Sequence, residues 1–237
     1  MFDRPNPATA GTAVIYDEGL REHFRKVYNT MTMGLVFTGL IAFLCASTPA
    51  IMTMFAQPMF AIAVAFLPLV LGFVMFNGNT LATKSAGDLR VRFYIFSGVF
   101  GLCLAPLVYM YSGANLARAF FVTAGTFAGV SAWSYTTKTD LSKFGSFLMM
   151  GVFGLILAMV VNIFLKSSMM DFVICAAGVL IYTGLTAYST QELKETYQSS
   201  AGDEANSKMA IMGALSLYIN FIMLFQFILR LMGGNRE

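Results

Sequence analysis

The stretch YTGLTAYSTQELKETY, residues 182–197, begins as an apolar segment and ends as a charged one. The same separation of apolar and charged residues holds along the whole chain. Of its 237 residues 57% are hydrophobic and only 11% are charged, whereas soluble domains carry roughly 25% charged residues. The charges fall between apolar runs or at their ends, as expected when a charge at mid-bilayer costs about 2.5–3.5 kcal/mol on insertion scales. The sequence therefore indicates a membrane protein.

Seven apolar runs are long enough to cross about 30 Å of hydrocarbon. They cover residues 29–48, 59–77, 94–112, 117–136, 145–165, 171–189 and 207–230, and the fourth is the most polar. Backbone groups must be paired inside lipid, and the ten-residue alternation of membrane barrels is absent, so the runs are predicted to be helices. We expect an all-α bundle of seven transmembrane helices over 29–230, an N-terminal tail over 1–28 and a short C-terminal tail over 231–237.

Basic residues are divided unevenly between the two sides of this bundle. With seven alternating crossings, 11 of the 15 Lys and Arg residues lie on the side of the N-terminus and four on the other side. The positive-inside rule then places the N-terminus in the cytoplasm and the C-terminus on the opposite, periplasmic side. In an alternative with six spans and a re-entrant last run, the C-terminus would return to the cytoplasm.

The sequence patterns of membrane enzymes and metal sites are missing. His23 is the only histidine and precedes the first apolar run, no run has an Asp at its centre, and no Gly-rich phosphate loop is present. Cys45, Cys103 and Cys175 each lie in a different run without CxxC spacing, so we interpret them as small hydrophobic residues. We predict that the protein is not an enzyme and has no catalytic residues, metal ligands, resident cofactor or nucleic-acid partner.

Neutral polar residues do occur inside the last two runs. Steps of three and four residues place Ser189 on one face of the sixth run with other small and polar residues, and Asn220 on a similar face of the seventh. One interpretation is that they form hydrogen bonds between helices, each worth about 0.6–2 kcal/mol. The other is that they line a polar cavity at the inner mouth of a permeation path, with Glu192 and Glu195 as an acidic vestibule.

Three segments resemble successive signatures of one known family. They are SYTTKTDLSKFGSFLMMG from Ser134, LIYTGLTAYSTQELKETY from Leu180 and GALSLYINFIMLFQFILRL from Gly213. In this order and at these separations they resemble the transmembrane Bax inhibitor motif family, in its bacterial YccA-like branch. The resemblance implies a fold in which the C-terminal helix is central and the other six helices surround it in two groups of three.

The resemblance also implies a function and a location. It suggests a pH-sensitive calcium leak in the bacterial inner (plasma) membrane, with transient Ca²⁺ binding and a link to stress responses. Besides the lipid bilayer, it suggests a membrane protease as a partner whose activity the protein modulates.

This chain departs from the family pattern at the two positions that matter most for pH sensing. The sixth-helix motif usually reads Tyr-Asp-Thr-Gln and the seventh-helix motif Leu-Tyr-Leu-Asp-Phe, whereas here the two acids are replaced by Ser189 and Asn220. Two carboxylates in contact share a proton and titrate together, but Ser189 and Asn220 can only hydrogen-bond to each other.

The replacement changes what we expect of the function. If Ser189 and Asn220 form part of an ion path or a latch, we expect pH gating to be weak or absent. We also expect calcium to be a less favoured ion, because calcium prefers charged oxygen ligands. The alternative is a non-conducting membrane interaction protein that modulates a membrane protease or a stress response.

Overall fold

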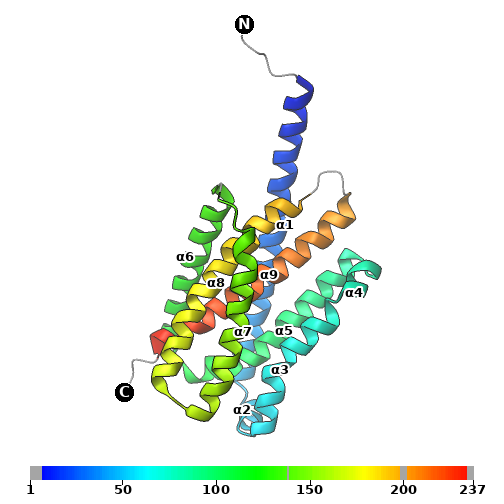
Figure 1. Ribbon diagram of the computed structural model, residues 1–237. Helices are drawn as coiled ribbons and strands as arrows, with labels where there is room; N and C mark the ends of the chain where they lie inside the picture. The colour runs from blue at the N-terminus through cyan, green and yellow to red at the C-terminus, as the bar shows by residue number, and fades with distance from the viewer. Residues whose placement is uncertain (1–6, 138, 198–201, 234–237) are drawn as a thin grey trace.

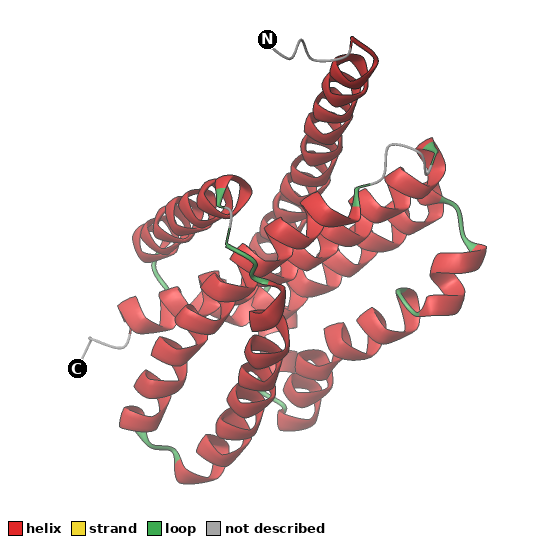
Figure 2. Ribbon diagram, turned by 45° about the horizontal axis from the view of Figure 1, so that its top comes forward, coloured by secondary structure: helices red, strands yellow, loops and turns green. Residues whose placement is uncertain are grey.

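The computed structural model describes residues 7–137, 139–197 and 202–233, with side chains from residue 18 onward. Within these residues the chain forms nine α-helices and no strand (Figure 2). The helices are α1 (Pro7–Ala46), α2 (Pro49–Phe55), α3 (Pro58–Met75), α4 (Gly78–Thr83), α5 (Ala86–Met110), α6 (Gly113–Thr136), α7 (Ser142–Leu165), α8 (Ser168–Thr196) and α9 (Asp203–Gly233). The all-α class predicted from the sequence is confirmed, and each apolar run falls largely within one long helix.

Six of these helices are long and apolar enough to cross a membrane. They are α1 from Glu18 onward, α3, α5, α7, α8 and α9. α6 has 24 residues and is long enough to cross a membrane, but the mean hydropathy of its most apolar stretch is lower than in any of the six helices. Gly125, Thr126, Ser131 and Ser134 are among the residues that make it more polar. Six membrane helices are thus supported, and a seventh crossing by α6 stays a prediction.

α9 is the most enclosed of the six helices. In its most apolar window 61% of the residues are buried, against at most 39% in any of the others. It contacts α1, α5, α6 and α8, while α3 packs on α5 and α7 packs on α8 (Figure 1). The extensive contacts therefore join α1, α3 and α5 into one group and α6, α7 and α8 into another, with α9 in contact with both.

Two clusters of buried hydrophobic residues lie along α9. The first joins α1, α5 and the first half of α9, where the rings of Phe93 and Phe96 meet Tyr218 edge to face. The second joins α8 to the second half of α9 and contains Leu224 and Phe227. Because one helix supplies residues to both clusters, burial of apolar area on α9 stabilises both groups of helices.

Local sequence explains where several helices begin. Ser85, Ser112 and Ser167 are N-caps, and each hydroxyl accepts a hydrogen bond from the backbone N–H three residues further on. Pro49 and Pro58 are the first residues of α2 and α3, a position at which proline is favoured because no N–H is needed there.

The N-terminal segment differs from the tail expected over 1–28. α1 continues across this boundary without a break, and Leu20, Phe24 and Val27 are buried in the cluster that α1 shares with α5 and α9. Their spacing of four and three residues forms an apolar stripe on one face of the helix, which is why this charged segment packs on the bundle. Of the expected C-terminal tail over 231–237, the first three residues belong to α9, which continues to Gly233. The remaining residues lie outside the part of the chain that the structure describes.

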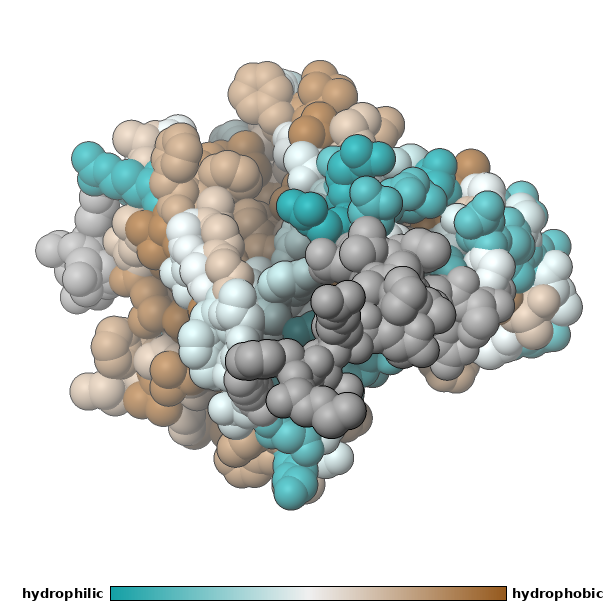
Figure 3. Space-filling view, turned by 90° about the horizontal axis from the view of Figure 1, so that it is seen from above, coloured by the Kyte–Doolittle hydropathy of each residue, from teal (hydrophilic) through white to brown (hydrophobic). Residues whose placement is uncertain are grey.

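The surface separates polar and apolar residues. Hydrophilic residues gather at the end of the molecule where α8 ends and α9 begins, which faces the viewer in Figure 3, and hydrophobic residues lie on the flanks. On α7, Phe153 is 63% and Phe164 82% exposed. Large apolar patches of this kind are rare on proteins surrounded by water, so these flanks indicate contact with the lipid bilayer.

Candidate functional site: a polar seam between α8 and α9

Two glycines let α8 and α9 approach each other closely. A Cβ atom placed on Gly178 would lie 2.6 Å from the ring of Phe227, and one placed on Gly213 would lie 2.0 Å from Cδ2 of Leu193. Real Cβ atoms do not approach other heavy atoms so closely. The absence of a side chain at Gly178 and Gly213 therefore makes room for the neighbouring helix, as small residues do in membrane helix pairs.

Between these two glycines lies a polar seam made of Ser189, Ser216 and Asn220. The side-chain amide of Asn220 donates a hydrogen bond from Nδ2 to Oγ of Ser189 over 3.1 Å. The same Oγ atom lies 3.0 Å from Oγ of Ser216, so a second hydrogen bond joins the two hydroxyls. Ser189 and Asn220 are each only 5% exposed. The hydrogen bond that the sequence predicts between them is present, and Ser216 is a third member that sequence reasoning did not assign.

The chemistry available to the polar seam is that of neutral groups. Hydroxyl and carboxamide side chains neither gain nor lose a proton in the physiological range. Within the described residues there is also no group of three or more His, Cys, Asp or Glu side chains arranged to hold a metal ion. The polar seam can therefore hold α8 against α9 by hydrogen bonds, but its charge does not change with pH.

The four polar residues that end the apolar part of α8 each contact a different neighbour. The ring of Tyr188 packs on the backbone of Gly145 in α7, where an added Cβ would lie 2.6 Å away. Ser189 bonds to α9, and Oγ1 of Thr190 lies 3.3 Å from Oγ of Ser131 in α6.

Gln191, the last of the four, binds the connection between α6 and α7. It accepts a hydrogen bond from the backbone N–H of Leu141 over 2.7 Å and donates one to the carbonyl of Thr139 over 2.8 Å. The string Tyr-Ser-Thr-Gln thus joins α8 to α7, to α9, to α6 and to the α6–α7 connection.

Three further polar contacts between helices were not predicted. Ser134 in α6 donates a hydrogen bond to the backbone carbonyl of Ala187 in α8. On the other side of α9, the hydroxyl of Tyr218 lies 2.6 Å from that of Thr38 in α1, which in turn lies 2.9 Å from the carbonyl oxygen of Ser97 in α5. Buried polar groups need such partners. A polar residue inside an apolar run was therefore a signal, available in the sequence, that a hydrogen bond forms there. The sequence did not show which residue the partner is.

Glu192 and Glu195 lie one turn or more beyond the polar seam. α8 continues as a helix to Thr196, as expected if the polar face extends past Ser189, and both carboxylates are exposed at its end. Leu193, between them, faces Gly213 on α9. The structure thus places the two acids in solvent-accessible positions, and their role as a vestibule stays a prediction.

The connection before α7 contains another ordered carboxylate, that of Asp140. Its Oδ1 accepts hydrogen bonds from the backbone N–H, over 2.9 Å, and from the hydroxyl of Ser142, the first residue of α7. These hydrogen bonds, helped by the charge of Lys143, lower the pKa of Asp140 below its ordinary value. A carboxylate at a helix N-terminus is further favoured by the helix dipole.

Comparison with known proteins agrees with these features. The family described as "Inhibitor of apoptosis-promoting Bax1" matches residues 20–237. The chain is 46% identical over 236 residues to an uncharacterized protein of Caulobacter vibrioides, with 93% of this chain and 92% of that protein covered. It is 38% identical over 221 residues to the inner membrane protein YbhL of Escherichia coli, with coverage of 92% and 94%. An uncharacterized protein of Rickettsia prowazekii is 36% identical over 222 residues, with coverage of 94% and 93%. On these matches, the chain belongs to the Bax inhibitor family.

Proposed function

We propose that this protein is an inner-membrane leak channel that conducts a cation passively and with little dependence on pH. Family membership supports a membrane role, the relative YbhL is named an inner membrane protein, and the excess of basic residues on one side favours a cytoplasmic N-terminus. The observation that carries the proposal is the hydrogen bond of 3.1 Å between Asn220 and Ser189, at the two positions where the family resemblance implies an acidic pair.

The physical argument rests on what these two residues cannot do. An acidic pair with an apparent pKa near 7 would change from about 90% protonated at pH 6 to about 10% at pH 8, which would alter the contact between the helices. The bond between Asn220 and Ser189 has no such proton, so its contribution to the free energy that holds α8 against α9 is the same across this range. Opening of a path beside the polar seam would then not be controlled by protonation of this pair. Calcium would bind weakly there, because neutral oxygens are poorer ligands for it than carboxylates.

Flux measurements in liposomes test the proposal. Purified protein is reconstituted, and entry of calcium and of a monovalent cation is followed at several pH values between 6 and 8. We expect measurable flux that changes little with pH. A steep titration of the wild-type flux within this range would overturn the argument from the neutral pair.

A double variant provides the sharper comparison. Ser189→Asp combined with Asn220→Asp restores two carboxyl groups, and we expect it to make the flux pH-dependent. Ser189→Asn is the matched control, because it adds a side chain of the same size as Asp without a titratable proton, and its flux should stay independent of pH. If neither the wild type nor the double variant conducts, the leak is refuted. The non-conducting role, with a membrane protease or a stress-response protein as partner, is then favoured.

A further inference from the structure

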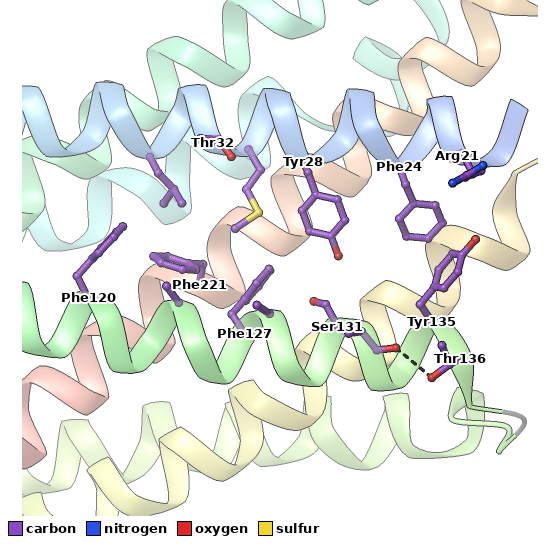
Figure 4. Close-up of a pocket in the computed structure, with 15 residues that line it drawn as sticks. Arg21, Phe24, Tyr28, Thr32, Phe120, Phe127, Ser131, Tyr135, Thr136 and Phe221 are labelled. Carbon is purple, nitrogen blue, oxygen red and sulfur yellow. Dashed lines mark hydrogen bonds between the residues drawn. The ribbon is translucent and has the colours of Figure 1, made fainter. Parts of the chain in front are cut away.

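A groove runs between α1 and α6 on the flank of the bundle, and we call it the α1/α6 groove. α1 and α6 face each other across it, and α9 closes its floor with Phe221 (Figure 4). Its volume is about 760 Å³. Aromatic and aliphatic side chains line most of it, including Tyr28 and Leu35 from α1 and Phe120 and Phe127 from α6.

The two ends of the α1/α6 groove differ in polarity. At one end Arg21 of α1 lies across from Tyr135 and Thr136 of α6, and Phe120 lies at the other end (Figure 4). Leu35 is the lining residue of α1 that is furthest along the helix from Arg21. The groove is therefore amphipathic along its length. An occupant that fits it has a polar, hydrogen-bonding head and an apolar body.

The charge pattern of α1 gives the depth of the groove in the membrane. Charged residues of α1 end at Lys26, and the stretch 27–46 carries none. At 1.5 Å per residue these twenty residues extend about 30 Å, the thickness of the hydrocarbon core. Arg21 then lies about 9 Å outside the hydrocarbon boundary, at headgroup level, and Leu35 about 12 Å inside it. The groove between them is about 21 Å long, which matches one leaflet including its headgroup region.

Positive charge gathers at the polar end. Arg21 is exposed, and within the described residues it forms neither an ion pair nor a hydrogen bond. The neighbouring acid Glu22 is paired with Lys26 over 3.2 Å. Nζ of Lys194 lies 5.3 Å from the centre of the Tyr135 ring and donates a hydrogen bond to the carbonyl of the same residue. This end of the groove is thus suited to a negatively charged group.

The polar end and the apolar lining together favour one kind of occupant. A hydrocarbon chain is narrower than a helix about 10 Å in diameter and satisfies the apolar lining of the α1/α6 groove. A lipid with a negatively charged headgroup satisfies the lining and Arg21 at the same time.

We propose that the α1/α6 groove binds one anionic phospholipid, with an acyl chain between α1 and α6 and the headgroup at Arg21. Basic residues at the ends of membrane helices hold such headgroups by charge. Apolar contact with Phe127 and Phe221 holds the chain. This site rests on the fold and on the membrane location, and it holds whether or not the protein conducts ions.

Native mass spectrometry of the purified protein tests this site. The protein is released from detergent after incubation with phosphatidylglycerol or with phosphatidylcholine of the same acyl chains. We expect one retained phosphatidylglycerol and weaker retention of phosphatidylcholine. Arg21→Ala should weaken phosphatidylglycerol binding about fivefold. Arg25→Ala is the matched control, because Arg25 is exposed on the same helix but does not line the groove, and it should leave binding unchanged.

A second pair of variants tests the apolar part of the groove. Ala128 lines the groove, so Ala128→Phe should fill it and abolish retention of both lipids. Ala117→Phe makes the same change at an exposed position of α6 outside the groove and should have no effect. Equal retention in the two phenylalanine variants would overturn the site. So would a dimer of the wild type that is lost only in Ala128→Phe, since the occupant would then be a second copy of this chain.

Discussion

The hydrogen bond between Asn220 and Ser189 should be measurable as a coupling free energy between α8 and α9. The perturbation is a double-mutant cycle built from Ser189→Ala, Asn220→Leu and the two changes together. Ser189→Ala removes the acceptor but leaves the amide of Asn220, which is only 5% exposed, inside the bundle. Asn220→Leu removes the amide and keeps a side chain of similar size.

The expected magnitudes follow from this burial. A buried donor left without a partner lowers stability by about 1–3 kcal/mol, so Ser189→Ala should reduce the free energy of unfolding by this amount. In the double variant no amide is left unpaired, and the loss should be smaller than the sum of the single losses. Couplings between membrane helices average about 0.6 and reach about 1.7 kcal/mol. Because Ser189 and Asn220 are both only 5% exposed, we expect a value in the upper half of this range.

The assay is equilibrium unfolding of the purified protein in mixed micelles, with helix content followed as SDS is increased. Ser146→Ala is the control, since Ser146 lies exposed on α7, and it should change the free energy of unfolding by less than about 0.5 kcal/mol. If the effects of the two seam changes add to within about 0.3–0.5 kcal/mol, the residues are energetically independent. The latch between α8 and α9 would then be refuted.

Two further changes probe how α9 packs. Gly178→Ala should lower the free energy of unfolding by about 1–3 kcal/mol, because the new Cβ would lie 2.6 Å from the Phe227 ring. Gly125→Ala, where the added atom meets nothing within 4 Å, should be neutral or stabilising in the same unfolding titration. Thr38→Val should lower stability by about 1–3 kcal/mol, since it removes the hydroxyl that lies 2.6 Å from that of buried Tyr218. A melting temperature unchanged by Thr38→Val would show that this contact contributes nothing.

The helical class and the positions of the long helices could be predicted from the sequence alone. Lipid cannot pair with backbone polar groups, so an uncharged run of about 20 residues has few alternatives to a helix. The same reasoning treated residues 1–28 as a tail, because charges precede the first apolar run. The structure describes residues 7–28 as part of α1, and the apolar stripe of Leu20, Phe24 and Val27, by which this segment packs on the bundle, was a pattern available in the sequence.

The contact between Ser189 and Asn220 was expected because both positions match those of an interacting pair in the family. Without that resemblance, helical spacing gives the face on which each residue lies but not the helix that it meets. For this reason the partners of Ser134 and Thr38 could not be predicted.

Tertiary structure alone decided the partners of the polar residues outside the Ser189–Asn220 pair and the shape of the lipid-facing surface. Whether α1 and α6 close on each other or leave a groove depends on how both helices pack against α9. Phe221 of α9 forms the floor of the α1/α6 groove. A sequence determines which segments enter the membrane, because that depends on the transfer free energy of each segment separately. The contacts between the segments depend on the shapes of several helices at once, and only the folded chain brings those shapes together.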